Sequence, residues 1–422
     1  MRFSSLDQWL DWQVSLHPKS VDLGLERVSH VWSRLSCQHE SYVISVAGTN
    51  GKGSSVAMLE AILINAGYRV GCFTSPHLVR YNERIKIDGK EASDEAICEA
   101  FEAIDNCRGN ISLTYFEFGT LAALYLFEQA RVEVMILEVG LGGRLDAVNI
   151  IDANAALITA IGIDHQEWLG NDREAIGREK AGIFRKDRLA VFSGNDMPES
   201  IRSESERRGT HLLVNGEDFQ LKSDGQQWSL IAELGSRHAL PIPAMRGKHQ
   251  LENAAGVIAL LLASREQLPV KAEAMKAGLL QAQVMGRFQI LQKAYPVIVD
   301  VAHNPQSTQS LAENLTKFVI RGKLLAIVGM LKDKDSLESL KNLAPQVDQW
   351  YLVSTHGERG LQASQLAENI HLIDADAECL LFNTVSEAYN SVLQNACEDD
   401  SILITGSFHI AGDFLAREAE LD

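Results

Sequence analysis

A short run between Val43 and Ser55 constrains this chain more than any other part of its sequence. A β-branched stretch, residues 43–46, leads into three glycines around one lysine, Lys52, and an apolar-periodic stretch restarts at Val56. This order predicts a strand, a phosphate-cradling turn and a helix. Glycine lets successive backbone N–H groups converge on one anion, and the following helix adds the positive end of its dipole.

The run departs from the common P-loop pattern, which requires Gly, four residues and then Gly-Lys-Ser/Thr. Here Val46 stands at the first glycine position, and Gly53 separates Lys52 from Ser54. A glycine-rich turn of another kind is the alternative. Because a lysine and a serine both stand at a strand-to-helix junction, we expect nucleotide binding. Lys52 would reach the outer phosphates, and the hydroxyl of Ser54 or Ser55 would hold Mg²⁺.

Composition and charge narrow the classes of partner. With 422 residues, the chain is long enough for about two or three domains, and 46% hydrophobic with 23% charged residues is typical of a globular protein. The net charge of −17 argues against general nucleic-acid or anionic-membrane binding. An anionic substrate therefore needs a local basic patch. Arg80, Arg84 and Lys86 form one candidate, and a solvated face is the alternative.

The cysteines and the N-terminus predict a cytoplasmic protein. No cysteine has Cys-x-x-Cys spacing, so we expect reduced thiols; the six are Cys37, Cys72, Cys98, Cys107, Cys379 and Cys397. The N-terminus lacks an apolar signal core. The longest apolar run, residues 257–263, is too short to span a bilayer.

Alternating apolar runs and helix-period stretches predict a mostly parallel sheet with helices on both faces. The expected strands are 42–47, 69–74, 132–139, 155–161 and 188–193, and the expected helices include 93–105 and 118–130. The polar segment 205–240, with its turn glycines, predicts a small antiparallel meander, and a helix is expected at 249–264.

A second alternating series predicts a separate, smaller doubly wound domain, joined near Gly286 to Pro296. Its expected strands are 296–301, 324–329, 350–354 and 401–405, and its expected helices are 307–319, 335–344, 363–369, 384–396 and 408–418.

Polar side chains follow several of the expected strands, and the carboxyl ends of parallel strands meet at one edge of a sheet. They are Ser75, His77, Glu138, Asp164, His165, Asp300 and His303. Hydroxyl, carboxylate and imidazole groups together suit divalent ions such as Mg²⁺. A carboxylate that ends an apolar strand, as Glu138 does, needs a partner such as a metal.

Each of these signals also has a structural interpretation. A histidine at a strand end is more often a hydrogen-bonding residue than a ligand. Asp300 and His303 could belong to a helix N-cap region, with Asn304 or Ser307 as the cap. Arg287 could be a linker residue or could reach a phosphate.

The chain resembles the folate branch of the Mur ligase superfamily, which comprises folylpolyglutamate synthase and bifunctional dihydrofolate synthase/folylpolyglutamate synthase. The matching motifs span nearly the whole chain in family order: Ala47 to Ser54, Thr74 to Leu78, Glu138 to Ala147, Asp164 to Gly170, Ile176 to Ile183, Gly286 to Phe288, Asp300 to Pro305 and Gly406 to His409. The unusual P-loop fits as well, because this family writes it as Gly-Lys-x-Ser/Thr.

The resemblance implies two domains, an ATP-binding domain over 1–287 and a glutamate-binding, Rossmann-like domain over 288–422. It also implies a reaction. ATP phosphorylates a substrate carboxylate, and the amine of L-glutamate displaces phosphate from the acyl phosphate. The bifunctional members act on dihydropteroate and on tetrahydrofolate, and a single-function folylpolyglutamate synthase is the alternative.

The resemblance also implies site residues. Nucleotide would be bound by Thr49, Asn50, Gly51, Lys52, Gly53, Ser54, Asn253, Arg287 and Asp300, and Mg²⁺ by Ser54, Ser75, Glu138 and His165. Lys180 would be carbamylated and support a second Mg²⁺, a plain phosphate-binding lysine being the alternative. Lys52, Lys180, His165 and His303 would be catalytic. In many members His-Asn precedes the ATP-contacting asparagine, whereas this chain has His249-Gln250.

The substrate side follows from the same resemblance. The segment Asp22-Leu23-Gly24-Leu25-Glu26-Arg27 resembles the pterin-side loop of bifunctional members and, with Phe116 and Asp146, would bind dihydropteroate. A helix-leading turn is the alternative. His409 would lie on the glutamate side. We further expect a monomer, no nucleic-acid or membrane partner, and K⁺ as an additional ion to consider.

Two other classes compete with the ligase. A nucleotide-binding switch or kinase would share the P-loop but need no glutamate domain. A binding module without catalysis would not need the clustered Mg²⁺-type ligands.

Overall fold

The computed structural model describes residues 2–35 and 40–420 and divides the chain into two compact units. The first unit comprises Met1–His77, Tyr81–Ala244 and Gln250–Gln283, and the second comprises Leu78–Arg80, Met245–His249 and Val284–Asp422. The structure thus divides the chain after Gln283 rather than after residue 287. It also gives the second unit two short earlier pieces, which a single boundary along a sequence leaves out.

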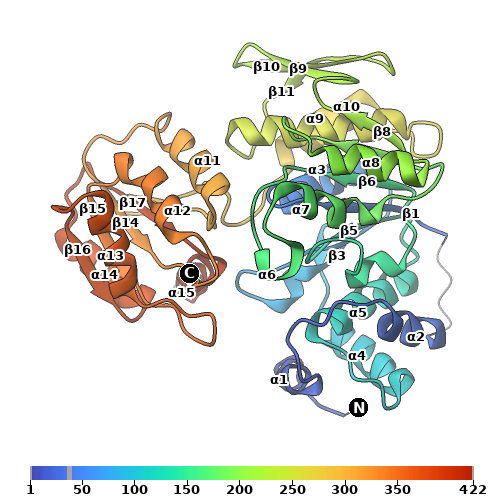
Figure 1. Cartoon of the computed structure of the whole chain (residues 1–422), viewed down its shortest axis with the longest axis horizontal. Helices are drawn as coiled ribbons and strands as arrows, with labels where there is room; N and C mark the ends of the chain where they lie inside the picture. Colours follow the sequence, from blue (N-terminus) through green and yellow to red (C-terminus); the bar gives the residue numbers. More distant parts are fainter. Residues whose placement is uncertain (1, 36–39, 421–422) are drawn as a thin grey trace. The chain divides into compact units, whose positions relative to one another are not determined.

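An eight-stranded sheet runs through the first unit in the order β4-β3-β2-β5-β1-β6-β7-β8. Figure 1 labels β1, β3, β5, β6 and β8 of this sheet. Its strands are β1 (Tyr42–Ala47), β2 (Val70–Phe73), β3 (Ile85–Ile87), β4 (Lys90–Glu91), β5 (Val134–Glu138), β6 (Ala155–Ile158), β7 (Leu189–Phe192) and β8 (His211–Val214). Within this sheet the antiparallel pairings are those of β3, with β2 on one side and β4 on the other. The predicted mostly parallel sheet is confirmed, and the two very short antiparallel strands at its edge were not predicted.

The helices of this part include those predicted at 93–105, 118–130 and 249–264. They are α1 (Leu6–Leu16), α2 (Glu26–Arg34), α3 (Lys52–Asn65), α4 (Asp94–Arg108), α5 (Tyr115–Ala130), α6 (Gln166–Leu169), α7 (Arg173–Lys180), α8 (Glu199–Arg208), α9 (Lys248–Ala263) and α10 (Ala272–Gln281), with 3-10 turns η1 (Tyr81–Arg84), η2 (Ala147–Ile150) and η3 (Ala181–Ile183).

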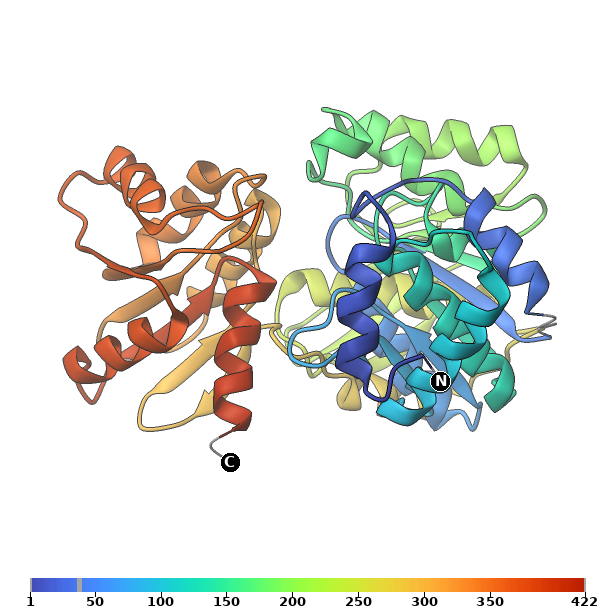
Figure 2. The ribbon, with the colours of Figure 1, turned by 90° about the horizontal axis from the view of Figure 1, so that it is seen from below.

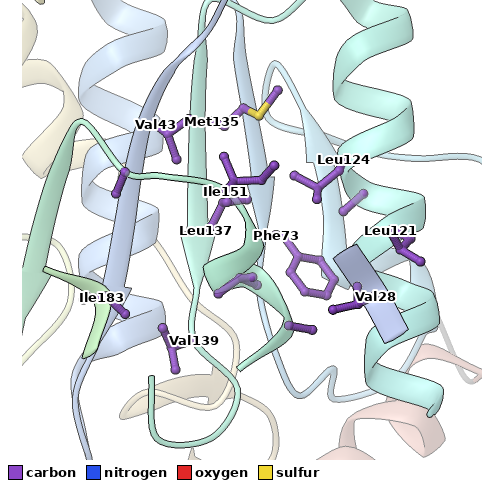
Figure 3. Packing of buried hydrophobic residues seen from close by; sticks show 14 of the residues in the cluster. Val28, Val43, Phe73, Leu121, Leu124, Met135, Leu137, Val139, Ile151 and Ile183 are labelled. Carbon is purple, nitrogen blue, oxygen red and sulfur yellow. The ribbon is translucent and has the colours of Figure 1, made fainter. Parts of the chain in front are cut away.

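Side chains that alternate along the strands fill two cores, because successive residues of a strand point to opposite faces. Met135 and Leu137 of β5 pack with Phe73 and with Leu121 and Leu124 of α5, as Figure 3 shows. On strand alternation, the face opposite Met135 and Leu137 carries the intervening β5 residues Val134, Ile136 and Glu138, and α3 contacts β5.

The segment predicted as an antiparallel meander, 205–240, is one only in its later part. An antiparallel three-stranded sheet forms from β9 (Phe219–Ser223), β10 (Gln227–Ala232) and β11 (Arg237–Pro241). Residues before it instead complete α8 and form β8, which pairs parallel with β7. The prediction was wrong for residues 205–214. The short strand β8 adjoins the polar segment in the sequence, so its pattern could not be separated from that of the meander.

The second unit is a six-stranded sheet covered on both faces. Strand order is β12-β13-β17-β14-β15-β16, and only β12 pairs antiparallel. The strands are β12 (Gln289–Gln292), β13 (Pro296–Val299), β14 (Leu324–Val328), β15 (Gln349–Val353), β16 (Cys379–Phe382) and β17 (Ser401–Thr405). The helices are α11 (Pro305–Leu315), α12 (Ser336–Leu343), α13 (Ala363–Ile373), α14 (Val385–Asn395) and α15 (Phe408–Ala419), with the turn η4 (Ala344–Gln346).

Two separate apolar clusters show the doubly wound arrangement of this unit. Residues of α11, α12 and α13 pack with one set of strand residues, and residues of α14 and α15 pack with the alternate set. Figure 2 shows α15, in red, beside the strands of this sheet. The predicted second domain is confirmed in its class; its edge strands β12 and β16 were not predicted.

The described cysteines are all free, and Cys37 lies outside the described residues. Among the helices that the structure describes, none is both long and apolar enough to cross a membrane.

Candidate active site

The glycine-rich turn links β1 to α3, as predicted, and two of its glycines are fitted to neighbouring side chains. A Cβ on Gly48 would lie 1.8 Å from Oγ1 of Thr159, which follows β6. A Cβ on Gly51 would lie 2.6 Å from Oδ1 of Asn253, and Gly51 has a φ of 89°. Any side chain at either position would displace these neighbours.

The start of the turn is fixed to the residues that follow β6. The Thr49 N–H donates to the Ala160 carbonyl at 2.8 Å, and the Thr49 hydroxyl donates to the Gly162 carbonyl at 3.0 Å. The Thr159 hydroxyl donates to the Asn50 carbonyl at 2.6 Å. The N–H and the hydroxyl of Thr49 are therefore engaged within the protein. A phosphate would be met by the first N–H groups of α3, since the first turn of a helix has no intrahelical acceptors for them.

Lys52 is the first residue of α3 and lies against the turn. Its Nζ donates to the carbonyl of Gly48 at 3.1 Å and to the carbonyl of Thr49 at 3.3 Å. The lysine predicted to reach outer phosphates thus stands at the N-terminus of the helix, where an anion is also favoured by the helix dipole.

Glu138 ends β5 and is 4% exposed. The Ser75 N–H donates to Oε2 of Glu138 at 3.3 Å, and the same oxygen lies 3.8 Å from a Cβ position on Gly53. Strand alternation explains this placement, because Glu138 lies on the face of β5 opposite Leu137. The structure therefore brings Glu138, Ser75 and the Gly53-Ser54 turn of α3 together, and the role of Glu138, Ser75 and Ser54 as Mg²⁺ ligands stays a prediction.

Two amide side chains from α9 complete this edge. Gln250 donates from Nε2 to the Ser54 hydroxyl at 3.2 Å, and Asn253 donates from Nδ2 to Oε1 of Gln250 at 3.2 Å. Gln250 was not predicted as a site residue. The sequence did carry a signal for it, because Gln250 stands where the resembling family has the Asn of its His-Asn order. In the structure this position orients Ser54.

Lys180 is the last residue of α7 and is 5% exposed. Burial and, after it, the charge of Lys52 lower the pKa of Lys180 to about 7, against the opposing effect of Asp164 and Asp146. A lysine with this pKa is largely uncharged slightly above neutral pH. Asp164, which the sequence places after an expected strand, thus acts electrostatically on Lys180.

Asp146 shares the surroundings of Lys180. Burial raises the pKa of Asp146 to about 6, although its carboxylate accepts the N–H groups of Leu141 at 2.8 Å and Val148 at 3.1 Å. The turn between β5 and Asp146 approaches α7 closely. A Cβ on Gly143 would lie 2.9 Å from the Lys180 carbonyl oxygen, so the glycine here permits the packing.

Comparison with known proteins decides the family. The description "Mur ligase middle domain" matches residues 46–261, and "Mur ligase, glutamate ligase domain" matches residues 286–408. The chain belongs to the Mur ligase family. The predicted family and fold class are thereby confirmed.

Individual relatives agree along the whole chain. The chain is 44% identical over 407 residues to the dihydrofolate synthase/folylpolyglutamate synthase of Escherichia coli, covering 96% of this chain and 94% of that one. A solved structure of E. coli FolC in complex with DHPP and ADP has a TM-score of 0.93 at 42% identity, with 99% of each chain covered. A bifunctional folylpolyglutamate synthase/dihydrofolate synthase with Mn, AMPPNP and L-glutamate bound has a TM-score of 0.91 at 43% identity, over 99% of this chain and 98% of that one.

In the second unit of this Mur ligase, two predicted residues lie by Phe408, and the charges of both act on a third, Asp300. The Arg287 guanidinium carbon lies 5.4 Å from the Phe408 ring centroid, and the His303 ring lies 5.8 Å from it. The Asp300 carboxylate accepts the N–H groups of Phe288 at 2.8 Å and Ala302 at 2.9 Å, while burial raises its pKa. Phe408, quoted only within a motif, thus positions Arg287 and His303.

The capping alternative for this segment is also confirmed. Asn304 caps α11 by accepting the Ser307 N–H at 2.9 Å, and His303 contacts the Val301 carbonyl through Nδ1 at 2.8 Å. His409 lies near Asp413, whose pKa burial raises and His409 lowers. In the first unit, His165 begins α6 with a φ of 53°, and its role as a fourth Mg²⁺ ligand stays a prediction.

The predicted substrate loop is fixed by ion pairs. Arg27 donates from Nη1 to the Asp22 carboxylate at 2.5 Å, from Nη2 to the Asp22 carbonyl at 2.8 Å and to Glu117 at 3.0 Å. Lys19 also pairs with Asp22 at 3.3 Å. The Asp22 carboxylate is therefore engaged within the loop. Arg27, the last residue of the predicted loop segment, ties the loop to the start of α5.

Phe116 lies beside this attachment and beside the Asp146 turn. It precedes Glu117 in α5, and a Cβ on Gly140 would lie 2.6 Å from its ring. The segment Leu23 to Leu25 leads directly into α2, with Leu25 at the N-cap position and no side-chain cap. The structure therefore links the loop, Phe116 and Asp146 through successive contacts.

Proposed function

We propose that this Mur ligase is a bifunctional dihydrofolate synthase/folylpolyglutamate synthase. It would use ATP to add L-glutamate to dihydropteroate, giving dihydrofolate, and to tetrahydrofolate, giving folylpolyglutamate. Relatives that cover more than nine-tenths of the chain carry this name, and solved neighbours are described with DHPP, ADP and L-glutamate. The alternative is a single-function folylpolyglutamate synthase.

One observation carries the proposal: the side chains of Lys52, Glu138 and Lys180 lie at the same edge of the first sheet. A carboxylate is a poor electrophile, and phosphate makes it a good one by supplying a leaving group. Lys52 and the N–H groups at the start of α3 would bind and orient the transferring phosphoryl group, where fixed positive charge is most effective. Asn253 would help to position the nucleotide beside Gly51.

The residues at this edge fit Mg²⁺. Glu138 offers a buried carboxylate. Ser75 and Gly53, the residue before Ser54, lie beside it. Ser54 and Ser75 would add their hydroxyl groups, with His165 as the proposed fourth ligand. Among the described residues no group of three or more His, Cys, Asp or Glu side chains could hold a metal. One carboxylate with hydroxyls and nucleotide phosphates is the kind of site that Mg²⁺ accepts. When bound, Mg²⁺ would neutralise charge on the phosphate oxygens.

Lys180 would be carbamylated. Its pKa of about 7 leaves a substantial fraction of uncharged amine at neutral pH, and only an uncharged amine can attack CO₂. The new N–C bond forms as the amine loses one proton to solvent. The product is a carbamate anion whose oxygens suit a second Mg²⁺, and the charge of Lys52 nearby would favour it. K⁺ stays a prediction.

The second unit would supply the remaining polar groups. Arg287 and Asp300 would contact ATP, and His303 and His409 would serve the glutamate and γ-phosphate side. The loop from Asp22 to Leu25, with Phe116 and Asp146, would bind dihydropteroate. A monomeric state and a cytoplasmic location stay predictions.

One assay tests the proposal. Purified protein with ATP, Mg²⁺ and L-glutamate is given dihydropteroate and tetrahydrofolate separately, and ADP and glutamylated product are measured. We expect ADP release that requires both the acid and the amine. Release without the amine would indicate a kinase or switch, no turnover would indicate a binding module, and activity with tetrahydrofolate alone would indicate the single-function enzyme.

A further inference from the structure

Arg84 is held from three sides in the first unit. It ends η1, directly before β3. Its Nε donates to Nδ1 of His77 at 2.7 Å, and its guanidinium carbon lies 5.5 Å from the ring centroids of both Tyr81 and Tyr115. The two tyrosine rings themselves meet edge to face at 5.6 Å. This arginine is therefore rigid before any ligand arrives.

The backbone of Arg84 is fixed as firmly as its side chain. Its carbonyl accepts the Thr74 N–H at 2.9 Å, and the carbonyl of Glu83 accepts the Thr74 hydroxyl at 3.3 Å. Thr74 is followed by Ser75, whose N–H donates to Glu138. Tyr115 is followed by Phe116. Arg84 thus contacts Thr74, the residue before the proposed Mg²⁺ ligand Ser75. It also contacts Tyr115, the residue before the proposed substrate residue Phe116.

The terminal nitrogens of Arg84 are what this arrangement leaves for a ligand. Among the described residues, Arg84 donates to a protein acceptor only through Nε, and it is half-buried. A guanidinium offers two parallel N–H groups that match a carboxylate, and stacking on aromatic rings orients it without using those groups. Lys86, its neighbour in the predicted basic cluster, instead acts on the half-buried Glu60, where burial raises the pKa of the carboxyl and the charge of Lys86 opposes that rise.

We propose that Arg84 determines specificity for glutamylated substrates by binding the α-carboxylate of their terminal glutamate. This inference rests on the proposed function. A carboxylate bound to both terminal nitrogens has its oxygens engaged and is a poorer nucleophile toward ATP, so the carboxylate bound here is one that does not react. Tetrahydrofolate has such a second carboxylate on its glutamate, and dihydropteroate has only the carboxylate that reacts.

Substrate and enzyme variants together test this. Wild-type full-length protein is compared on tetrahydrofolate and on its α-carboxamide, which differ only at that carboxylate. We expect kcat/KM to favour the carboxylate by about 10-fold or more, the usual scale for a charge-assisted pair. In Arg84→Met this preference disappears, and the loss in kcat/KM with tetrahydrofolate, mainly through KM, exceeds the loss with dihydropteroate by a similar factor. Arg84→Lys keeps the charge without the fork and lies between.

Lys90→Met is the matched control, because it removes one exposed positive charge from the adjoining strand β4. It should keep the preference for the α-carboxylate. A wild-type enzyme that uses tetrahydrofolate without preferring the α-carboxylate overturns the inference, whether or not Arg84→Met folds. Equal losses with both substrates, with the preference intact, also overturn it. Absence of turnover with either substrate refutes the proposed function instead.

Discussion

The side-chain amide of Asn253 occupies the space that a Cβ on Gly51 would need, with Oδ1 of Asn253 2.6 Å from that position. Gly51 precedes α3 and Asn253 lies in α9. The turn that would hold phosphate is therefore fitted to a helix some two hundred residues later in the chain. Residues so far apart in sequence have no spacing from which this fit could be predicted.

Gly51→Ala should weaken ADP binding and lower stability. The substitution puts a side chain at a φ of 89° and against Asn253, and the backbone strain alone costs about 1–2 kcal/mol. Calorimetry with ADP and urea unfolding measure both effects. Gly67→Ala is the matched control, because Gly67 has a φ of 93° but no atom near its Cβ position. Equal costs at the two positions would contradict the close fit.

Lys52→Ala should lower turnover by about 100-fold or more, the scale seen when one transition-state charge stabiliser is removed. The Nζ donates to the carbonyls of Gly48 and Thr49 in its own turn, where Lys52 is half-buried, and such bonds contribute little to the free energy of unfolding, so the unfolding transition should change little. Steady-state rates and urea unfolding are the measurements. Lys222→Ala, on the exposed strand β9, serves as a control. Near-normal turnover of Lys52→Ala would remove this lysine from the mechanism.

Lys180→Met should remove a pH-dependent term from the free energy of unfolding. The pKa of Lys180 in the folded protein is lowered to about 7 from 10.5, so between these values the unfolded chain binds more protons. The wild type should therefore gain stability relative to Lys180→Met as pH rises above 7, by at most about 1.4 kcal/mol per pH unit. Urea unfolding in CO₂-free buffer from pH 7 to 9 tests this. A flat difference would show that Lys180 is not buried as an amine.

Carbamylation of Lys180 should be visible directly. Protein equilibrated with ¹³C-bicarbonate and Mg²⁺ should show a carbamate carbon signal that is missing from Lys180→Ala. Removing CO₂ should reduce turnover, and adding bicarbonate should restore it. The burial of Lys180 supports this, because it lowers the pKa so that an uncharged amine is available near neutral pH. A bare amine in the active, Mg²⁺-loaded enzyme would contradict the modification.

Sequence patterns predicted the parts of this molecule that depend on local order. Buried apolar runs predicted β1, β5 and β14. The rule that the carboxyl ends of parallel strands share an edge predicted that Ser75 and Glu138 lie close together. Short edge strands were missed, because β4 has only two residues and β16 places Leu381 51% exposed. Their apolar pattern is too brief to distinguish from a loop.

Contacts between distant residues lay beyond the sequence. The Gln250–Ser54 hydrogen bond joins residues 196 positions apart. The guanidinium of Arg84 in turn lies over the ring of Tyr115, which belongs to α5. A residue's type at such a position says which bonds it can form, and only the fold says with which partner. The pKa of Lys180 is a similar case, because burial is its main cause.

Arg27→Met should impair dihydropteroate use more than tetrahydrofolate use. Arg27 joins the Asp22 loop to Glu117, whose side chain is 4% exposed against 27% for Arg27. Without Arg27, the loop loses this ion pair with α5, and the buried Glu117 side chain loses its partner, at a cost of about 1–3 kcal/mol. If the loop binds dihydropteroate, KM for that substrate should rise, because the pterin of a glutamylated substrate would be bound elsewhere.

The control for this last variant is Arg202→Met, which breaks an ion pair with Glu217 that is exposed on both sides. Surface pairs of that kind contribute about 0–1 kcal/mol, so this variant should keep both activities and nearly all stability. Comparing the two variants separates loss of an ion pair from loss of the loop. Equal increases in KM for both substrates in Arg27→Met would mean that one site serves both, and that the loop does not distinguish dihydropteroate from folate.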